Sequence, residues 1–114
     1  MKIKQLKQQL PVVQKVYDSI ENFERKVDLR HAFKELRELD EWAEEERKKI
    51  IQEYANENGE IPPAVQYEVG QKIEKLFDTE VEIEKPLTFK KEEIKKANLK
   101  GSELAMIYDD YVNE

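Results

Sequence analysis

The 114-residue sequence is strongly charged and acidic, with 40% Asp, Glu, Lys and Arg, 39% hydrophobic residues and a formal net charge of −6. It contains no cysteine, which excludes disulfides, thiolate metal sites and cysteine nucleophiles. Only three glycines and four prolines accompany five Tyr, four Phe and one Trp, a balance typical of a helical protein and not of a β-sandwich, a barrel or a disordered chain. We expect one helical domain over residues 1–114.

The first predicted helix covers residues 3–23, where apolar residues recur every three or four positions. Pro11 interrupts it, because proline lacks an amide proton and clashes with the carbonyl four residues back. Two outcomes are open: a kink at Pro11, or a short helix that ends near Gln9. The apolar stripe continues in phase across Pro11, which favours the kink.

A second, long helix is predicted over residues 28–57, about 45 Å at 1.5 Å per residue, with Asp28 as its N-cap. The polar link of residues 24–27 is short, so the two helices should form an antiparallel hairpin. We expect the hairpin to bury Phe23 and Trp42 among its apolar contacts. The second half of the long helix has fewer apolar residues, and later elements or a partner must cover it.

Gly59 marks a turn, and Pro62 and Pro63 begin a third helix that should end at Phe77. Strict alternation over residues 79–84 predicts a short strand, with residues 87–89 as a second extended piece. One or two helical turns follow at residues 90–97. A last helix is expected over residues 103–112, with Ser102 as N-cap. The predicted fold class is therefore mainly α: an antiparallel helical hairpin with a long second helix, a third and a C-terminal helix, and a short β-strand or β-ribbon near residues 80–89.

The sequence offers little catalytic chemistry. His31 is the single histidine and has no carboxylates at ligand spacing, so no metal or other cofactor is expected. The run Glu44-Glu45-Glu46 could be a solvated helix face, a mimic of nucleic-acid charge or a divalent-metal site. The first interpretation is favoured, because Arg47-Lys48-Lys49 neutralises much of the field. Phosphate-loop, serine-hydrolase and zinc-protease motifs are absent from the sequence, and we expect a protein that is not an enzyme.

Several segments carry a resemblance to small proteins of unassigned activity that are encoded by tailed phages and prophages. The segments are Leu10-Pro11-Val12-Val13, Glu45-Glu46-Arg47-Lys48-Lys49-Ile50-Ile51-Gln52-Glu53-Tyr54, Asn58-Gly59, Glu80-Val81-Glu82-Ile83, Pro86-Leu87 and Leu99-Lys100-Gly101-Ser102-Glu103-Leu104. The sequence departs from those proteins between the first two helices, where residues 21–27 replace a tighter, proline-containing link. The resemblance implies a phage context and transfers no functional residues.

The leading hypothesis is a non-enzymatic phage-type protein that binds a protein partner and modulates or inhibits a host or antiviral-defence protein in the host cytoplasm. The alternative is a virion morphogenesis component or assembly helper that self-associates through the long helix or the short strand. Nucleic acid is not an expected partner of so acidic a chain, and no membrane association is expected because no segment is long and apolar enough to span a bilayer. The candidate partner-binding residues are Glu45, Glu46, Lys49, Tyr54, Tyr67, Val81 and Ile83.

Overall fold

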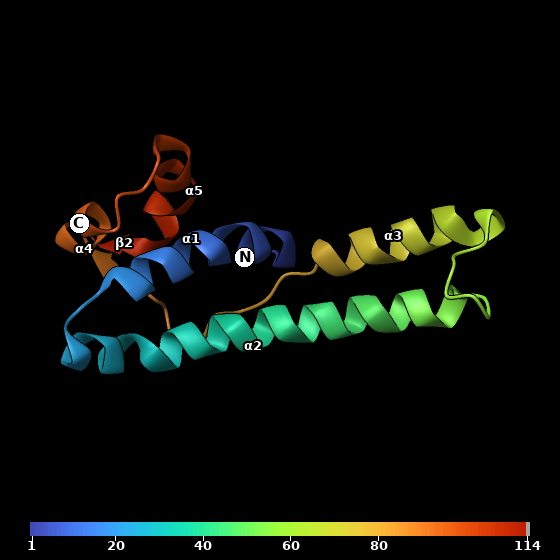
Figure 1. Ribbon diagram of the computed structural model, residues 1–114, viewed down its shortest axis with the longest axis horizontal. Coiled ribbons are helices and arrows are strands. Elements are labelled where there is room, and N and C mark those ends of the chain that lie inside the picture. Colours follow the sequence, from blue (N-terminus) through green and yellow to red (C-terminus); the bar gives the residue numbers. More distant parts are fainter. Residues whose placement is uncertain (114) are drawn as a thin grey trace.

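Helices dominate the fold of residues 1–113, the part of the chain that the computed structural model describes (Figure 1). α1 (Ile3–Ser19) and α2 (Phe23–Tyr54) form an antiparallel hairpin, followed by the 3₁₀ helix η1 (Pro63–Val65) and α3 (Gln66–Phe77). An extended connector, residues 78–88, leads to β1 (Phe89–Lys90), α4 (Lys91–Lys96), α5 (Gly101–Tyr111) and β2 (Val112–Asn113). The structure confirms the predicted class: mainly α, with a long second helix, a third and a C-terminal helix, and a small β element.

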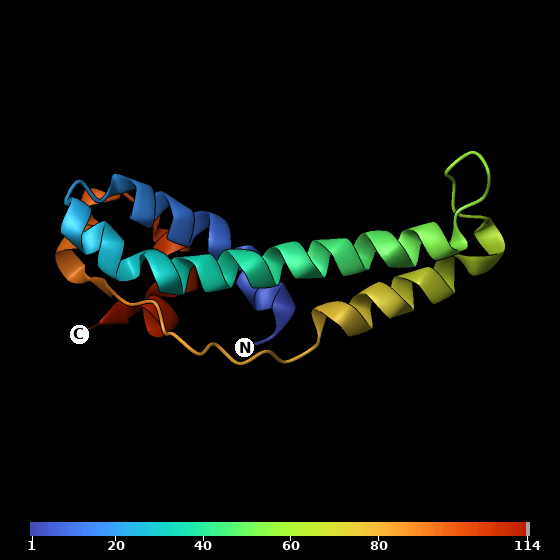
Figure 2. The same cartoon turned by 90° about the horizontal axis from the view of Figure 1, so that it is seen from below.

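The molecule is elongated, with principal extents of 52 × 27 × 25 Å. Figures 1 and 2 show α1, α4, α5 and the first half of α2 gathered at one end. We call this end the head (residues 1–40 and 83–113). The second half of α2 and α3 continue beyond it as a two-helix hairpin, which we call the distal arm (residues 41–77).

The main hydrophobic core lies in the head, where α1 contacts α2, α4 and α5. Its buried residues are Leu6, Val12, Val13, Val16, Ile20, Leu29, Ala32, Phe33, Leu36, Leu87, Phe89, Ile94, Ala97, Ile107 and Tyr111. Each fully buried Leu, Ile, Val or Phe contributes about 1.5–3 kcal/mol relative to an exposed one. The head therefore supplies most of the hydrophobic stabilisation.

One buried polar side chain, Gln9, joins α1 to α5. Its amide nitrogen donates to the Met106 carbonyl oxygen at 3.2 Å and to Asp110 Oδ2 at 2.7 Å, and its Oε1 accepts from the Tyr111 hydroxyl at 3.0 Å. Burial, together with the charge of Asp110, raises the pKa of Tyr111 to about 12. Because all these groups are paired, the site avoids the cost of an unsatisfied buried polar atom.

The link between the first two helices is shorter and earlier than predicted. It consists of residues 20–22, and the Asn22 side chain caps α2 by accepting from the Arg25 amide at 3.0 Å. The expected cap, Asp28, lies inside α2, and Phe23 lies in its first turn with 83% of its surface exposed. The prediction was wrong because both the apolar stripe and the polar run 24–27 continue across the true boundary, whereas the local cap of Asn22 determines it.

In the hairpin, the less favoured alternative at Pro11 and the expected burial of Trp42 need correction. α1 is continuous from Ile3 to Ser19 through Pro11, so a helix ending near Gln9 is wrong. Pro11 is exposed and faces away from the core, where the loss of one amide donor is tolerated. Trp42 is 44% exposed and does not belong to the hairpin core, because α2 buries the adjacent Ala43 at this point and directs Asp40 and Glu44 to Lys7 of α1.

The predicted ribbon at residues 79–84 is replaced by a single antiparallel bridge between Lys2 and Glu80. The paired strands are β1 and β2, which run parallel with Phe89 opposite Val112 and Lys90 opposite Asn113. Apolar and charged residues alternate over residues 79–84 because the connector lies against the head with one side facing solvent. Val81 and Ile83 are half-buried there, between exposed glutamates. The C-terminal partner of β1 has no sequence signal because a two-residue strand is too short to show one.

The same type of capping hydrogen bond lies at the start of α4 and of α5. Glu93 accepts from the Lys90 amide at 2.8 Å, and Glu103 accepts from the Lys100 amide at 2.9 Å. Each carboxylate lies three residues after the cap, where it meets the exposed amides of the first turn. α5 thus begins at Gly101 after the cap Lys100, and the prediction of Ser102 as N-cap was wrong.

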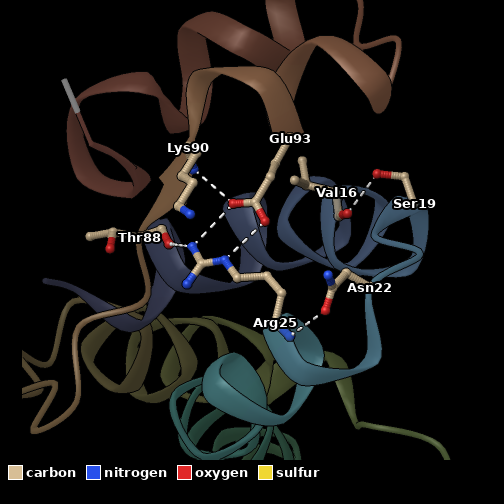
Figure 3. A network of polar contacts seen from close by, with 7 residues as sticks. All are labelled: Val16, Ser19, Asn22, Arg25, Thr88, Lys90 and Glu93. Carbon is tan, nitrogen blue, oxygen red and sulfur yellow. Dashed lines mark hydrogen bonds and ion pairs between the residues drawn. The ribbon is translucent and has the colours of Figure 1, made fainter.

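Figure 3 shows the contact that fastens α4 to α2. The Arg25 guanidinium donates to both oxygens of Glu93, at 2.9 and 3.0 Å, and to the Thr88 carbonyl oxygen at 2.9 Å. Burial opposes ionisation of Glu93, but the hydrogen bonds from Arg25 and Lys90 outweigh it and hold the pKa of Glu93 below its usual range. This bidentate salt bridge between Arg25 and Glu93 holds α4 against the start of α2.

Candidate functional site

The distal arm is the part of the molecule with the least complete core. Of its residues only Ala43 and Val69 are buried. The other apolar residues of its seam are half-buried: Ile50, Ile51, Tyr54, Ile61, Val65, Ile73, Leu76 and Phe77. Two helices present only one face to each other, so a hairpin without a third element leaves the sides of its seam open.

Polar contacts close the outer end of the arm. The Tyr54 hydroxyl donates to Glu68 at 2.9 Å, joining α2 to α3, and the Lys72 ammonium lies 4.8 Å from the centre of the Tyr54 ring. The interaction with the Tyr54 hydroxyl and the charges of Glu53 and Glu68 raise the pKa of Lys72. Tyr54 therefore has a structural task in the arm besides any recognition role.

The inner end of the arm is clamped to α1. The Lys7 ammonium lies 2.8 Å from Asp40 and 2.6 Å from Glu44, and 5.5 Å from the centre of the Phe77 ring. Hydrogen bonds from Lys7 and Arg47 lower the pKa of Glu44. These contacts bring α1, α2 and α3 together where the arm leaves the head.

The structure divides the candidate residues between two places. Glu45, Glu46, Lys49, Tyr54 and Tyr67 lie on the arm. Glu45 and Lys49 are exposed, and Glu46 is half-buried and pairs with Lys49 at 3.4 Å. Tyr67 is 78% exposed, and its hydroxyl accepts from the Gln71 amide at 2.6 Å. The arm thus presents one prominent aromatic side chain beside charged groups.

The other two candidates, Val81 and Ile83, lie on the connector. The Val81 amide donates to the Met1 carbonyl oxygen at 2.8 Å, and Ile83 packs against the core of the head. Figure 2 shows the connector running alongside the first half of α2, away from the arm's outer end. Val81 and Ile83 therefore do not form one surface with Tyr54 and Tyr67.

The concave features formed by α1, α2 and α3 are open and lined by mixed charges. A groove of about 560 Å³ lies between α1 and α2, where Tyr17 stacks on Phe33 with ring centres 4.5 Å apart. Within residues 1–113 there is no group of three or more His, Cys, Asp and Glu side chains arranged to hold a metal ion. His31 is an exposed residue of α2.

Sequence reasoning missed a group of lysines on the head. Lys90, Lys91, Lys95, Lys96 and Lys100 are all exposed, on or beside α4. The signal was present in the sequence, since lysine occupies five of the eleven positions from 90 to 100. It was overlooked because the net charge of the last half of the chain is negative.

Comparison with known proteins identifies no family: no family model matches the sequence, and no curated protein or solved structure is significantly similar to it. The helices of residues 1–113 include none with both the length and the hydropathy needed to cross a bilayer.

Proposed function

We propose that this protein acts without catalysis, by binding another protein through its distal arm. In the phage context that the sequence resemblance implies, the partner is a host or antiviral-defence protein whose activity the binding modulates or inhibits. The observation that carries the proposal is the half-open seam of the arm. A hairpin with a purely structural role does not need to project from the head with partly exposed apolar residues. A surface that binds another protein needs such residues to be accessible.

The composition of the arm supports this role. Tyr67 and Trp42 expose 78% and 44% of their surfaces, and Tyr and Trp are the residues most enriched at binding hot spots. Glu45 and Lys49 are exposed charged residues of the same arm, and they suit the polar rim of an interface. The clamp of Lys7 with Asp40 and Glu44 holds the base of the arm, so little order has to be gained on binding.

Affinity capture from a lysate of a bacterial host tests the proposal. The immobilised full-length chain is expected to retain a stoichiometric partner, and the variant with Trp42→Ala and Tyr67→Ala to retain it at least about tenfold less well. The matched control is Phe23→Ala, which removes an aromatic side chain of 83% exposure from the head. Circular dichroism checks that all variants remain helical.

The proposal is overturned if no stoichiometric protein is recovered, or if the arm variant captures the same protein as strongly as the unaltered chain. Loss of the partner with Phe23→Ala alone would place the contact on the head.

A specific charge pattern favours a second candidate, a morphogenesis component or assembly helper that self-associates through α2. Glu44-Glu45-Glu46 is followed directly by Arg47-Lys48-Lys49. Two copies of α2 that cross antiparallel at this point would place each acidic block against the other copy's basic block, as a twofold interface requires. Glu45 and Lys48 are exposed and have no ion pair among residues 1–113.

Sedimentation velocity distinguishes this candidate. Self-association through α2 predicts a dimer that Glu45→Lys dissociates and that the double variant Glu45→Lys, Lys48→Glu restores, because the swap returns opposite charges to facing positions. A chain that remains monomeric at the highest attainable concentration rules this candidate out.

A further inference from the structure

A small apolar cleft lies on the head, away from the distal arm. Its volume is about 160 Å³, and it is formed by α4, α5 and the start of β2. The lining residues are Lys91, Ile94, Lys95, Leu104, Tyr108 and Val112. The lining surface is almost wholly apolar, so Lys91 and Lys95 contribute their methylene stems while their ammonium groups remain at the rim.

The rim of this cleft is strongly basic on an acidic protein. Lys91 and Lys95 line the cleft and are exposed, and neither forms an ion pair with another residue in the range 1–113. Of the two acidic residues of α4, Glu93 is neutralised by Arg25. Glu92 is thus the one carboxylate of α4 that opposes the lysines.

Two sets of contacts hold the helices that form the cleft. The contact of Arg25 with Glu93 and Thr88, drawn in Figure 3, holds α4 against α2, and the parallel pairing of β1 with β2 joins the start of α4 to the end of α5. A preformed recess lowers the entropic cost of binding.

We propose that this cleft is a docking site for an acidic peptide segment of another protein, with one apolar side chain inserted in the recess. A dry cavity of about 150 Å³ accommodates a benzene ring, so the recess suits a single Phe or Leu side chain. The flanking lysines supply the complementary charge for carboxylates on either side of that anchor. This site goes beyond the proposed role of the distal arm and shares none of its residues.

The same features disfavour nucleic acid. The walls of the recess provide almost no hydrogen-bonding groups with which to read a base, and the net charge of −6 repels a phosphate backbone outside the lysine rim.

Fluorescence anisotropy with defined probes tests the inference. The probe is a fluorescein-labelled eight-residue peptide that has one central phenylalanine between glutamates. We expect it to bind the full-length chain, and to bind about tenfold more weakly after Lys91→Glu with Lys95→Glu. The matched control is Lys48→Glu with Lys75→Glu, which changes the net charge equally on two exposed lysines of the arm.

Two further measurements test whether the apolar side chain of the peptide, and not its charge alone, occupies the recess. Replacing the central phenylalanine of the peptide by serine is expected to lower its affinity at least about tenfold, because the recess is then unfilled. This peptide variant leaves the fold of the protein untouched. Amide chemical shifts should change at Ile94, Leu104 and Val112 when the phenylalanine peptide binds.

The inference is overturned if the phenylalanine peptide does not bind, if the serine peptide binds equally well, or if the arm control weakens binding as much as the α4 variant. Tighter binding of an eight-nucleotide single-stranded DNA, or of vesicles that contain an anionic lipid, would assign the basic surface to a different class of ligand and also overturn it.

Discussion

At the scale of single residues, the contact between Arg25 and Glu93 connects stability to pH. The folded protein holds the pKa of Glu93 below its usual range, so the folded state binds the Glu93 proton more weakly than the unfolded chain does. The stabilisation is therefore complete above the unfolded-state pKa, near 4.3 for glutamate, and is lost as the pH falls through the folded-state pKa.

Replacement of this carboxylate gives a direct prediction. Glu93→Gln should lower the free energy of unfolding at neutral pH by about 1–2 kcal/mol, since it weakens a charge-assisted, partly buried pair. Urea unfolding at several pH values measures the effect, and the difference from the unaltered protein should shrink below about pH 4. Glu92→Gln is the control, because Glu92 is an exposed neighbour. Equal stability of Glu93→Gln and Glu92→Gln would contradict the prediction.

The candidate residues show how far sequence reasoning extends at this scale. Tyr67 could be selected as a candidate recognition group because Tyr is enriched at interfaces, but its helical spacing did not predict its 78% exposure. That Tyr54 is engaged with Glu68 could not be foreseen, since the contact joins two helices whose relative rotation depends on packing. The hydrogen bonds of Gln9 to α5 could likewise not be predicted from the sequence, because its partners lie about a hundred residues away in the chain.

At the scale of elements, the helices were predictable and several of their ends were not. α1, α2 and α3 carry long apolar stripes, which are robust signals. The start of α2 was misplaced by five residues of chain between Phe23 and Asp28 because one local hydrogen bond at Asn22 outweighs a broad pattern. β1 and β2 are too short to leave any periodic signal, and each forms only because the other is brought beside it.

Pro11 offers a test of how α1 tolerates a proline. The Pro11 ring leaves the Lys7 carbonyl without its usual amide donor, while the helix continues on both sides. Pro11→Ala should raise the free energy of unfolding by about 2 kcal/mol, which is the helix penalty of proline less its effect on the unfolded chain. Urea denaturation gives the value. Gln8→Ala, at an exposed neighbouring position, should change it by less than about 0.5 kcal/mol.

If Pro11→Ala brought no gain over Gln8→Ala, the proline would be shown to fit α1 without cost.

At the scale of the whole molecule, head and distal arm differ in how much apolar surface they bury. The head has one continuous core, whereas the arm has two buried residues, Ala43 and Val69. Sequence patterning anticipated this inequality from the sparse apolar residues in the second half of α2. It could not anticipate that the lysines of α4 meet at one end of an acidic molecule, because that depends on how α4 docks.

Because the head buries more apolar residues than the distal arm, we expect the arm to unfold locally more often than the head. Amides of α3 should exchange with solvent at a lower opening free energy than amides in the middle of α1, because few buried contacts resist the separation of the arm helices. Hydrogen exchange followed by NMR measures both. Gly70→Ala, at a position with open space around it, should raise the protection of α3 by about 1 kcal/mol and leave α1 unchanged. Equal protection of α3 and α1 would contradict this account of the arm.

Met1 and Ile3 form hydrogen bonds and an ion pair with residues 79–81, which the ribosome synthesises much later. The Ile3 amide donates to the Thr79 carbonyl oxygen at 3.1 Å, the Met1 carbonyl oxygen accepts from the Val81 amide, and the terminal ammonium group pairs with Glu80 at 3.0 Å. During synthesis on the ribosome, α1 and α2 emerge before α4 and α5, so the side of α1 that α4 and α5 cover is at first exposed to solvent. Contacts between such distant parts of a chain form slowly and late. Until α4 and α5 are made, the growing chain therefore exposes apolar residues of α1, and such exposed apolar surface favours aggregation.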